Sequence, residues 1–221
     1  MLSIRTLVLA VAATLAIPTA FAQDNTSTAD SIESESASSK RFAVVGGYSL
    51  LEPKSNPGTV AGAQSDVDGD DAATLSASWY ANDNIAVEFW GAVDKYDHRV
   101  KLNGAKAASV SQQPIALSGQ YHFGAADNIV RPFVGLGYYE SNFDSEDTEP
   151  TGPASGARIG VTTQKGAMAT IGADFNITPT WFARTDLRYL HGDADVEVNG
   201  IKAGELDLNP YVLSVGIGAR F

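Results

Sequence analysis

The sequence predicts an all-β protein: an eight-stranded antiparallel transmembrane β-barrel with short periplasmic turns and long extracellular loops. Three observations predict it. Apolar residues alternate with small or polar residues along most of the chain after Arg41. The face opposite to the apolar one carries Gly, Ala and Ser, whereas a solvated face would carry Lys and Glu. The chain begins with an export signal. Lipid would take the apolar face, and closure of the barrel would leave no unpaired backbone in hydrocarbon.

Composition narrows the function classes. The 221 residues carry a net charge of −11, so nucleic acid is not expected as a partner, because phosphate binding needs a basic face. Cysteine is absent, which excludes disulfides, thiolate metal sites and a cysteine nucleophile.

Residues 1–22, MLSIRTLVLAVAATLAIPTAFA, are predicted to be a signal peptide. Arg5 precedes a short apolar run that ends in Ala20-Phe21-Ala22, a small-x-small cleavage pattern. An uncleaved N-terminal anchor is the alternative. Residues 23–40 are Ser-, Thr- and acid-rich and are predicted to be a flexible polar tail, with a binding role as the alternative. The barrel, residues 41–221, is expected in the cell outer membrane with both termini in the periplasm.

The expected strands follow from the alternation. They are 41–51, 72–81, 84–102, 105–123, 130–143, 166–177, 180–198 and 201–221. The connections 82–84, 124–128 and 178–180 are short, whereas 52–71 and 141–165 are long and polar, so short and long connections lie at opposite ends. Asn103-Gly104 and Asn199-Gly200 predict tight hairpin tips on strands that project past the others.

The last strand shows the pattern most clearly. Its apolar face carries Tyr211, Leu213, Val215, Ile217 and Phe221. At the tilt of a barrel strand these residues span roughly 25 Å, the height of a lipid-facing band. Aromatic residues end the stripe, as they do at membrane interfaces. We therefore expect Phe221 at the periplasmic rim.

Three segments carry a family resemblance: YANDNIAVEFWGA, QYHFGAADNIVRPFVGLGYY and the terminal NPYVLSVGIGARF. Over residues 72–221 the chain resembles the OmpW family of outer-membrane barrels. The resemblance implies a narrow channel that passes small, often hydrophobic molecules, with a lateral opening through which they leave into the bilayer. It also implies that the terminal apolar stripe, from Tyr211 to Phe221, is the signal that the barrel assembly machinery reads.

The charged residues on inward-facing positions are candidates for a constriction. The expected inward set is Glu88, Trp90, Gln120, His122, Asp174, Arg184, Asp186, Arg188, Ser214 and Arg220. Arg184, Asp186 and Arg188 share one strand face, and Glu88 is expected to join them across the lumen. Two interpretations stay open: an ion-paired plug and a polar filter for small solutes. Family members known for hydrophobic transport tend to have an aromatic residue at the position of Arg188.

Pro114 is the candidate for the lateral opening, because it matches a proline of the family near that opening. Proline has no amide hydrogen and removes one bond from a strand ladder. The seam between the third and fourth strands would then be weak. A bulge above the membrane rim is the alternative.

Acidic residues gather in the long connections. They are Asp66, Asp68, Asp70 and Asp71 in the first, and Glu140, Asp144, Glu146, Asp147 and Glu149 in the second. DVDGDD is similar to part of a calcium loop but lacks the distal glutamate, so neither a metal site nor a cofactor is expected. Divalent bridging to lipopolysaccharide phosphate and a solvated acidic surface are the remaining interpretations.

Two other function classes are known for small outer-membrane barrels: enzymes that modify lipid A, and plugged barrels that bind external partners. A lipid A-modifying enzyme would need a serine–histidine pair, and none of His98, His122 and His191 stands in a His-x-Ser motif, so we do not expect an enzyme. A plugged structural or adhesive barrel, whose loops bind external partners, is the alternative to a small-molecule channel.

Overall fold

The computed structural model describes residues 36–53, 58–60, 63–67, 69–102, 105–148, 159–198, 201–206 and 209–221. The chain divides into two units, residues 1–35 and 36–221, and all described residues belong to the second. The predicted signal peptide 1–22, the tail up to residue 35, Asp68, Glu149 and both predicted Asn-Gly tips lie outside the described residues.

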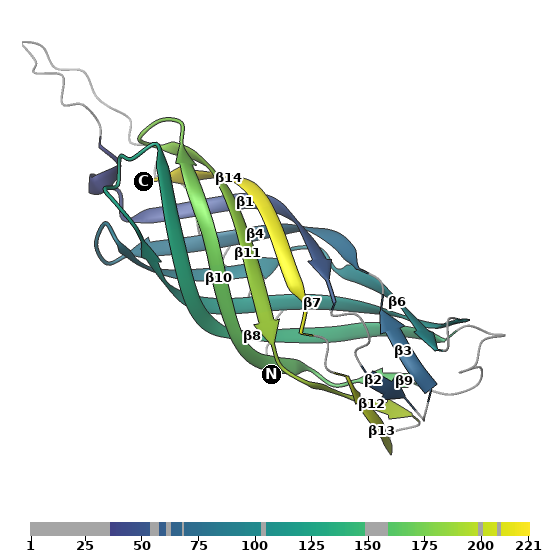
Figure 1. The fold of residues 1–221 in the computed structure, drawn as a ribbon. Helices are drawn as coiled ribbons and strands as arrows, with labels where there is room; N and C mark the ends of the chain where they lie inside the picture. The colour runs from purple at the N-terminus through teal and green to yellow at the C-terminus, as the bar shows by residue number, and fades with distance from the viewer. Residues whose placement is uncertain are drawn as a thin grey trace, which may run out of the picture. The chain divides into compact units, whose positions relative to one another are not determined.

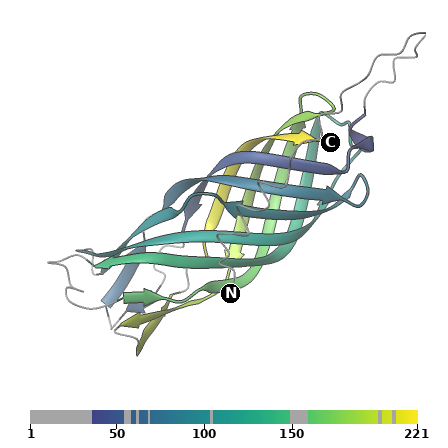
Figure 2. The same cartoon turned by 180° about the vertical axis from the view of Figure 1, so that it is seen from behind.

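Within the described residues, eight long strands form a closed antiparallel barrel (Figures 1 and 2). They are β1 (Phe42–Glu52), β4 (Asp70–Tyr80), β5 (Ile85–Ala92), β7 (Ala105–His122), β8 (Val130–Thr148), β10 (Gln164–Asn176), β11 (Trp181–His191) and β14 (Tyr211–Arg220). Each pairs with the next in this order, and β14 pairs with β1 to close the ring. The predicted fold class is confirmed.

Shorter strands lie at the end of the barrel away from the chain's C-terminus (Figure 1). β2 (Gly58–Val60), β3 (Ala63–Val67) and β6 (Tyr96–Leu102) extend the barrel sheet along β7. β9 (Ile159–Val161), β12 (Ala194–Val198) and β13 (Ile201–Leu206) form a separate three-stranded sheet. Among the described residues no helix is long and apolar enough to cross a membrane.

Several predicted boundaries were wrong at this end. The predicted strands 84–102, 180–198 and 201–221 are each two strands: the chain bends at 93–95, the strand is interrupted at 192–193, and β13 and β14 are separate strands that end at Leu206 and begin at Tyr211. Of the predicted loop 141–165, residues 141–148 continue β8 and stay paired with β7, and residues 159–161 form β9. Beyond the membrane a paired strand has polar surroundings on both faces, so it need not show the alternation that marks the membrane-spanning part.

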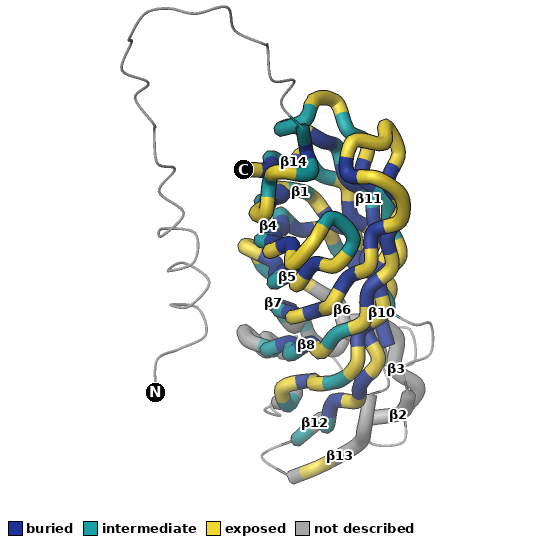
Figure 3. The backbone as a smooth tube through the Cα atoms, turned by 90° about the vertical axis from the view of Figure 1, so that its left-hand side faces the viewer, coloured by how far each residue is buried: buried dark blue, intermediate teal, exposed yellow. Residues whose placement is uncertain are grey.

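Burial alternates along the barrel strands, as Figure 3 shows by the change between dark blue and yellow. All ten residues of the expected inward set are buried. The outer face is apolar and exposed, with Leu136 at 75 % and Ile171 at 60 % exposure. The five residues of the terminal stripe, Tyr211, Leu213, Val215, Ile217 and Phe221, are all exposed on this outer face.

Exposed aromatic side chains mark both edges of the outer apolar band. Beside the short turns and the C-terminus stand Phe42, Trp79, Tyr121, Phe123, Phe175, Trp181 and Phe221. Towards the opposite ends of their strands stand Tyr48, Tyr138 and Tyr211. Two aromatic rims about an apolar band are the pattern of a membrane-spanning barrel.

The short-turn end is held together by backbone bonds between distant segments. The amides of Arg41 and Phe42 donate to the carbonyl oxygen of Phe221, at 3.1 and 2.9 Å. The 3-10 turn η1 (Ala37–Ser39) is held by Asp127, which lies in the turn between β7 and β8. The Ala37 amide donates a hydrogen bond to Asp127 Oδ1 at 2.8 Å, and Ser36 Oγ donates one to Asp127 Oδ2 at 2.7 Å. Both ends of the described unit therefore lie at this rim.

Candidate functional site

Strand alternation places three acidic and three basic residues of the expected inward set in the lumen. Glu88 comes from β5, Asp174 from β10, Arg184, Asp186 and Arg188 from β11, and Arg220 from β14. Each is at most 4 % exposed. We call these six residues the charged layer.

Glu88 is the centre of the charged layer. Its Oε2 accepts a hydrogen bond from Arg184 Nη1 at 2.7 Å, and its Oε1 accepts one from Arg188 Nη1 at 2.9 Å. β5 and β11 stand on opposite sides of the eight-strand ring, four places apart in the strand order. The two ion pairs therefore cross the whole diameter of the lumen.

The other members extend this network in both directions. Asp186 Oδ1 accepts from Arg188 Nε at 2.7 Å. Asp174 accepts two hydrogen bonds from Arg184, at 2.6 and 3.0 Å, and a third from Arg220 Nη2 at 2.8 Å. A continuous chain of charge-assisted hydrogen bonds thus runs from Asp186 to Arg220, and removal of any one member would leave at least one buried charge with one partner fewer.

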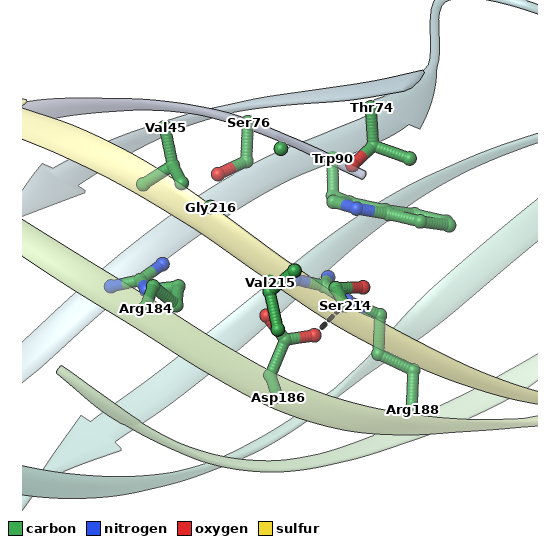
Figure 4. A pocket seen from close by; sticks show the side chains of 11 residues that line it. Val45, Thr74, Ser76, Trp90, Arg184, Asp186, Arg188, Ser214, Val215 and Gly216 are labelled. Carbon is green, nitrogen blue, oxygen red and sulfur yellow. Dashed lines mark hydrogen bonds and ion pairs between the residues drawn. The ribbon is translucent and has the colours of Figure 1, made fainter. Parts of the chain in front are cut away.

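Aromatic rings and small residues complete the charged layer. The guanidinium carbon of Arg188 lies 4.6 Å from the Trp90 ring centroid, and that of Arg220 lies 4.0 Å from the Phe182 ring centroid. Gly47 and Gly216 face each other on β1 and β14 and line the cavity, and a Cβ at either position would collide with the backbone of the opposite strand. The cavity that remains beside Arg184, Asp186 and Arg188 measures about 10 Å³, enough for about one water (Figure 4). In this conformation the charged layer closes the lumen.

A second layer lies between the charged layer and the extracellular strands, and it is apolar. Its members are Leu51, Ala72, Trp90, Ala92, Tyr96, Ala116, Tyr139, Met168, Leu190 and Val212. All are buried and in mutual contact, and we call them the apolar layer. Of its members, the expected inward set named only Trp90, and the large apolar side chains at inward positions near the extracellular strand ends were not predicted.

The strand ladder is interrupted beside this apolar layer. β5 pairs with β7 up to Gly91 opposite Ile115, and β6 resumes the pairing at Tyr96 opposite Gln112. Four residues, 92–95, therefore face only two, 113 and 114. We call this interruption the seam.

Pro114 explains why the ladder stops there. Continued from Gly91 and Ile115, the register sets Ala92 opposite Pro114, which has no amide hydrogen to donate. The carbonyl oxygen of Ala92 instead accepts from the side-chain Nε2 of Gln113 at 3.0 Å. On its other side Pro114 is opposite Ser141, within the continuous pairing of β7 and β8. The seam thus lies only between β5/β6 and β7, and one side-chain hydrogen bond replaces a backbone bond in it.

The other candidate residues lie elsewhere. The Asp97 amide donates to Asp70 at 2.5 Å, and the Tyr48 hydroxyl hydrogen-bonds to Asp71. The side chains of Asp66, Asp144, Glu146 and Asp147 lie outside the described part of the structure. Of the histidines whose side chains are described, His122 Nε2 lies 3.1 Å from Gln120 Oε1, and His191 Nδ1 lies 3.0 Å from Asn209 Oδ1. Neither contact is the serine–histidine pair that a lipid A-modifying enzyme would need.

One buried charged residue was missed by the sequence reasoning. Arg131 on β8 is 2 % exposed and points inward, opposite Asp174 in the ladder. The signal was present, because Val130, Pro132 and Val134 share the exposed parity while Arg131 and Phe133 share the buried one.

A closed barrel with an apolar outer band, two aromatic rims and a charged interior is an outer-membrane β-barrel protein. Comparison with known families identifies the family to which this barrel belongs. The family model of the OmpW family matches residues 42–221, and the chain belongs to that family.

Individual relatives are distant but cover most of the chain. Outer membrane protein W of Vibrio cholerae is 24 % identical over 192 residues, which are 81 % of this chain and 88 % of that protein. The crystal structure of OprG from Pseudomonas aeruginosa has a TM-score of 0.72 at 23 % identity and covers 82 % of this chain and 96 % of that one. The solution structure of the E. coli outer membrane protein W has a TM-score of 0.56 at 23 % identity, with 82 % and 98 % covered.

Proposed function

We propose that this outer-membrane barrel takes small hydrophobic or weakly polar molecules into its extracellular end and releases them sideways into the membrane at the seam. The observation that carries this proposal is the position of the seam: Ala92 and Tyr96, which border it, both belong to the apolar layer. A solute that enters the apolar layer meets the charged layer on the periplasmic side, and the weakest part of the surrounding wall is the seam.

The chemistry of the two layers favours this route for apolar solutes. The apolar layer provides the dispersion contacts that such a solute needs. The charged layer would have to give up ion pairs to let it pass, and an apolar solute offers no compensating hydrogen bond. The exit at the seam requires displacement of the Gln113 side chain from the Ala92 carbonyl, which is one hydrogen bond.

Pro114→Ala tests the proposal. An alanine amide at position 114 can donate to the Ala92 carbonyl and close the seam, so uptake of an apolar solute into liposomes should fall about fivefold, the equivalent of about 1 kcal/mol for one hydrogen bond. Swelling rates with small polar solutes should stay unchanged. Pro132→Ala is the matched control, because Pro132 is also a wall proline but lies near the short-turn rim.

Gln113→Leu is the complementary variant. It leaves the Ala92 carbonyl without its donor and should raise apolar uptake. If neither Pro114→Ala nor Gln113→Leu alters apolar uptake while both barrels assemble, lateral release is wrong.

A second candidate function rests on the small size of the cavity. A lumen with only about 10 Å³ free beside the charged layer fits a plugged barrel whose extracellular strands and loops bind external partners. That alternative predicts no solute flux above that of protein-free liposomes, for polar and apolar solutes alike.

A further inference from the structure

We propose that the periplasmic part of the lumen holds a binding site for one small monovalent anion, formed by Arg131 together with Tyr80 and Gln120. The site is separate from the seam and does not depend on the transport proposal. It follows from the charge of the lumen and from hydrogen-bond donors that lack partners.

The described buried side chains carry one excess positive charge. Four guanidinium groups, those of Arg131, Arg184, Arg188 and Arg220, are buried with three carboxylates, those of Glu88, Asp174 and Asp186. The carboxylates are all bound to Arg184, Arg188 and Arg220. Arg131 is the guanidinium that remains.

Arg131 is close to a carboxylate that it does not bind. It stands opposite Asp174 in the ladder between β8 and β10, but both oxygens of Asp174 accept from other arginines. Nε and Nη2 of Arg131 are buried and have no hydrogen-bond partner. Its guanidinium carbon lies 6.0 Å from the Tyr80 ring centroid, at the outer limit of a cation–π contact, which compensates the charge only weakly.

Two other buried donors without partners are linked to this guanidinium by a series of side-chain contacts that runs from Tyr80 through His122 to Gln120. The Tyr80 hydroxyl and Gln120 Nε2 are both buried and without a partner. Tyr80 packs on His122 with ring centroids 5.2 Å apart, and His122 Nε2 contacts Gln120 Oε1, which leaves the Gln120 amide nitrogen free to donate elsewhere. Nε of Arg220 is also buried and without a hydrogen-bond partner.

These features define the ligand. The donors are two guanidinium nitrogens, a hydroxyl and a primary amide, all of which can donate to an anion, and the positive guanidinium disfavours a cation. The excess among the described buried side chains is one positive charge, so one negative charge balances them. A bound water would satisfy single donors but would leave the positive charge uncompensated. We therefore assign the site to a small monovalent anion such as chloride.

Thermal unfolding of the refolded barrel tests the site, with sodium chloride exchanged for sodium gluconate at constant ionic strength. The midpoint temperature of wild-type unfolding should rise with the logarithm of chloride concentration. A ligand that binds only the folded state stabilises it in proportion to the logarithm of the ligand concentration once that concentration exceeds the Kd. Arg131→Met should abolish the dependence. In gluconate it should unfold at or above the wild-type midpoint, because it removes a buried unpaired charge. Arg41→Met is the control: Arg41 is an exposed arginine paired with Asp83, and this variant should respond to chloride as the wild type does.

Two further measurements fix the position of the site. Crystals soaked in sodium bromide should show one buried anomalous peak beside Arg131. Tyr80→Phe keeps the ring and removes the hydroxyl. It should lower the affinity for chloride about tenfold, so that a higher chloride concentration is needed for the same shift of the unfolding midpoint. An unfolding midpoint that is equal in chloride and gluconate, or an Arg131→Met barrel that responds like the wild type, overturns the proposal. Should Arg131→Met fail to refold, Tyr80→Phe decides: an unchanged chloride response counts against the site, and a weaker one supports it.

Discussion

Nη1 of Arg184 lies 2.7 Å from Oε2 of Glu88, and this ion pair joins residues that are 96 positions apart in the chain and on opposite sides of the barrel. It acts as a strut between β5 and β11, which share no backbone hydrogen bonds.

Glu88→Gln should lower the free energy of unfolding by about 3–5 kcal/mol, because it leaves Arg184 and Arg188 with less compensation inside the barrel. Urea unfolding in lipid vesicles measures the change. Asp83→Asn breaks the exposed pair with Arg41 and should cost at most about 1 kcal/mol. Equal, small effects of the two substitutions would mean that water screens the charged layer and that the lumen is not a dry plug.

Arg188→Ala should change conductance and ion selectivity if the charged layer filters polar solutes. The substitution removes the partner of Asp186 and the side chain over Trp90, so it enlarges the cavity and makes the lumen less positive. Planar-bilayer reversal potentials should shift towards cation preference. Lys165→Ala, which removes an exposed charge next to Glu140, should leave them in place. If neither the wild type nor Arg188→Ala conducts ions in the planar bilayer, the plugged barrel that binds external partners is favoured over the channel.

Phe221→Ser tests the proposed assembly signal without shortening the chain. The backbone of Phe221 exchanges hydrogen bonds with Phe42, and serine preserves these bonds while it removes the exposed ring. We expect lower outer-membrane levels and periplasmic aggregates, measured by fractionation and by gel mobility before and after boiling. Phe123→Ser removes an aromatic residue from the same rim and should assemble normally. Equal losses in both variants would indicate a girdle effect and not a terminal signal.

The contact between η1 and Asp127 should depend on pH. Hydrogen bonds from Ser36 and the Ala37 amide hold the pKa of Asp127 below its ordinary value of 3.8. A carboxylate with a depressed pKa stabilises the folded contact above its unfolded pKa and loses this effect as the pH falls through the folded one. Hydrogen exchange at the Ala37 amide should therefore show protection at neutral pH and down to the ordinary carboxyl range, with release only at lower pH. Asp127→Asn should abolish this transition, and a transition that persists in Asp127→Asn would assign it to another group.

Sequence alternation identified the charged residues of the lumen and the approach of Glu88 to the charged row of β11, but not the part of Asp174 and Arg220 in the same network. Arg184 and Glu88 stand out because each is a charged residue on the parity opposite to the apolar, exposed residues of its strand. The atoms that meet depend on the order and register of the three intervening strands, which no local pattern encodes. The apolar layer was missed for a related reason. Met168 and Leu190 look like outward residues until the parity of the whole strand is fixed, and near the strand ends that parity is hardest to assign.

The seam was predicted in part. Pro114 marks a missing donor from sequence alone, but the two-residue mismatch with β5 and β6 and the replacement bond from Gln113 depend on the bend at 93–95, which the alternation did not reveal. The prediction of a single continuous strand from 84 to 102 failed at the place where the wall is interrupted.

The pairing of β1 with β14 sets a limit on how the molecule can be made. Ala43 is opposite Arg220, so the ring closes only when almost the entire polypeptide has been exported. Until then both edge strands present unpaired amides and carbonyls to any other chain nearby. A polypeptide that stops before β14 would keep two open edges permanently and should be an aggregating species, not a smaller barrel.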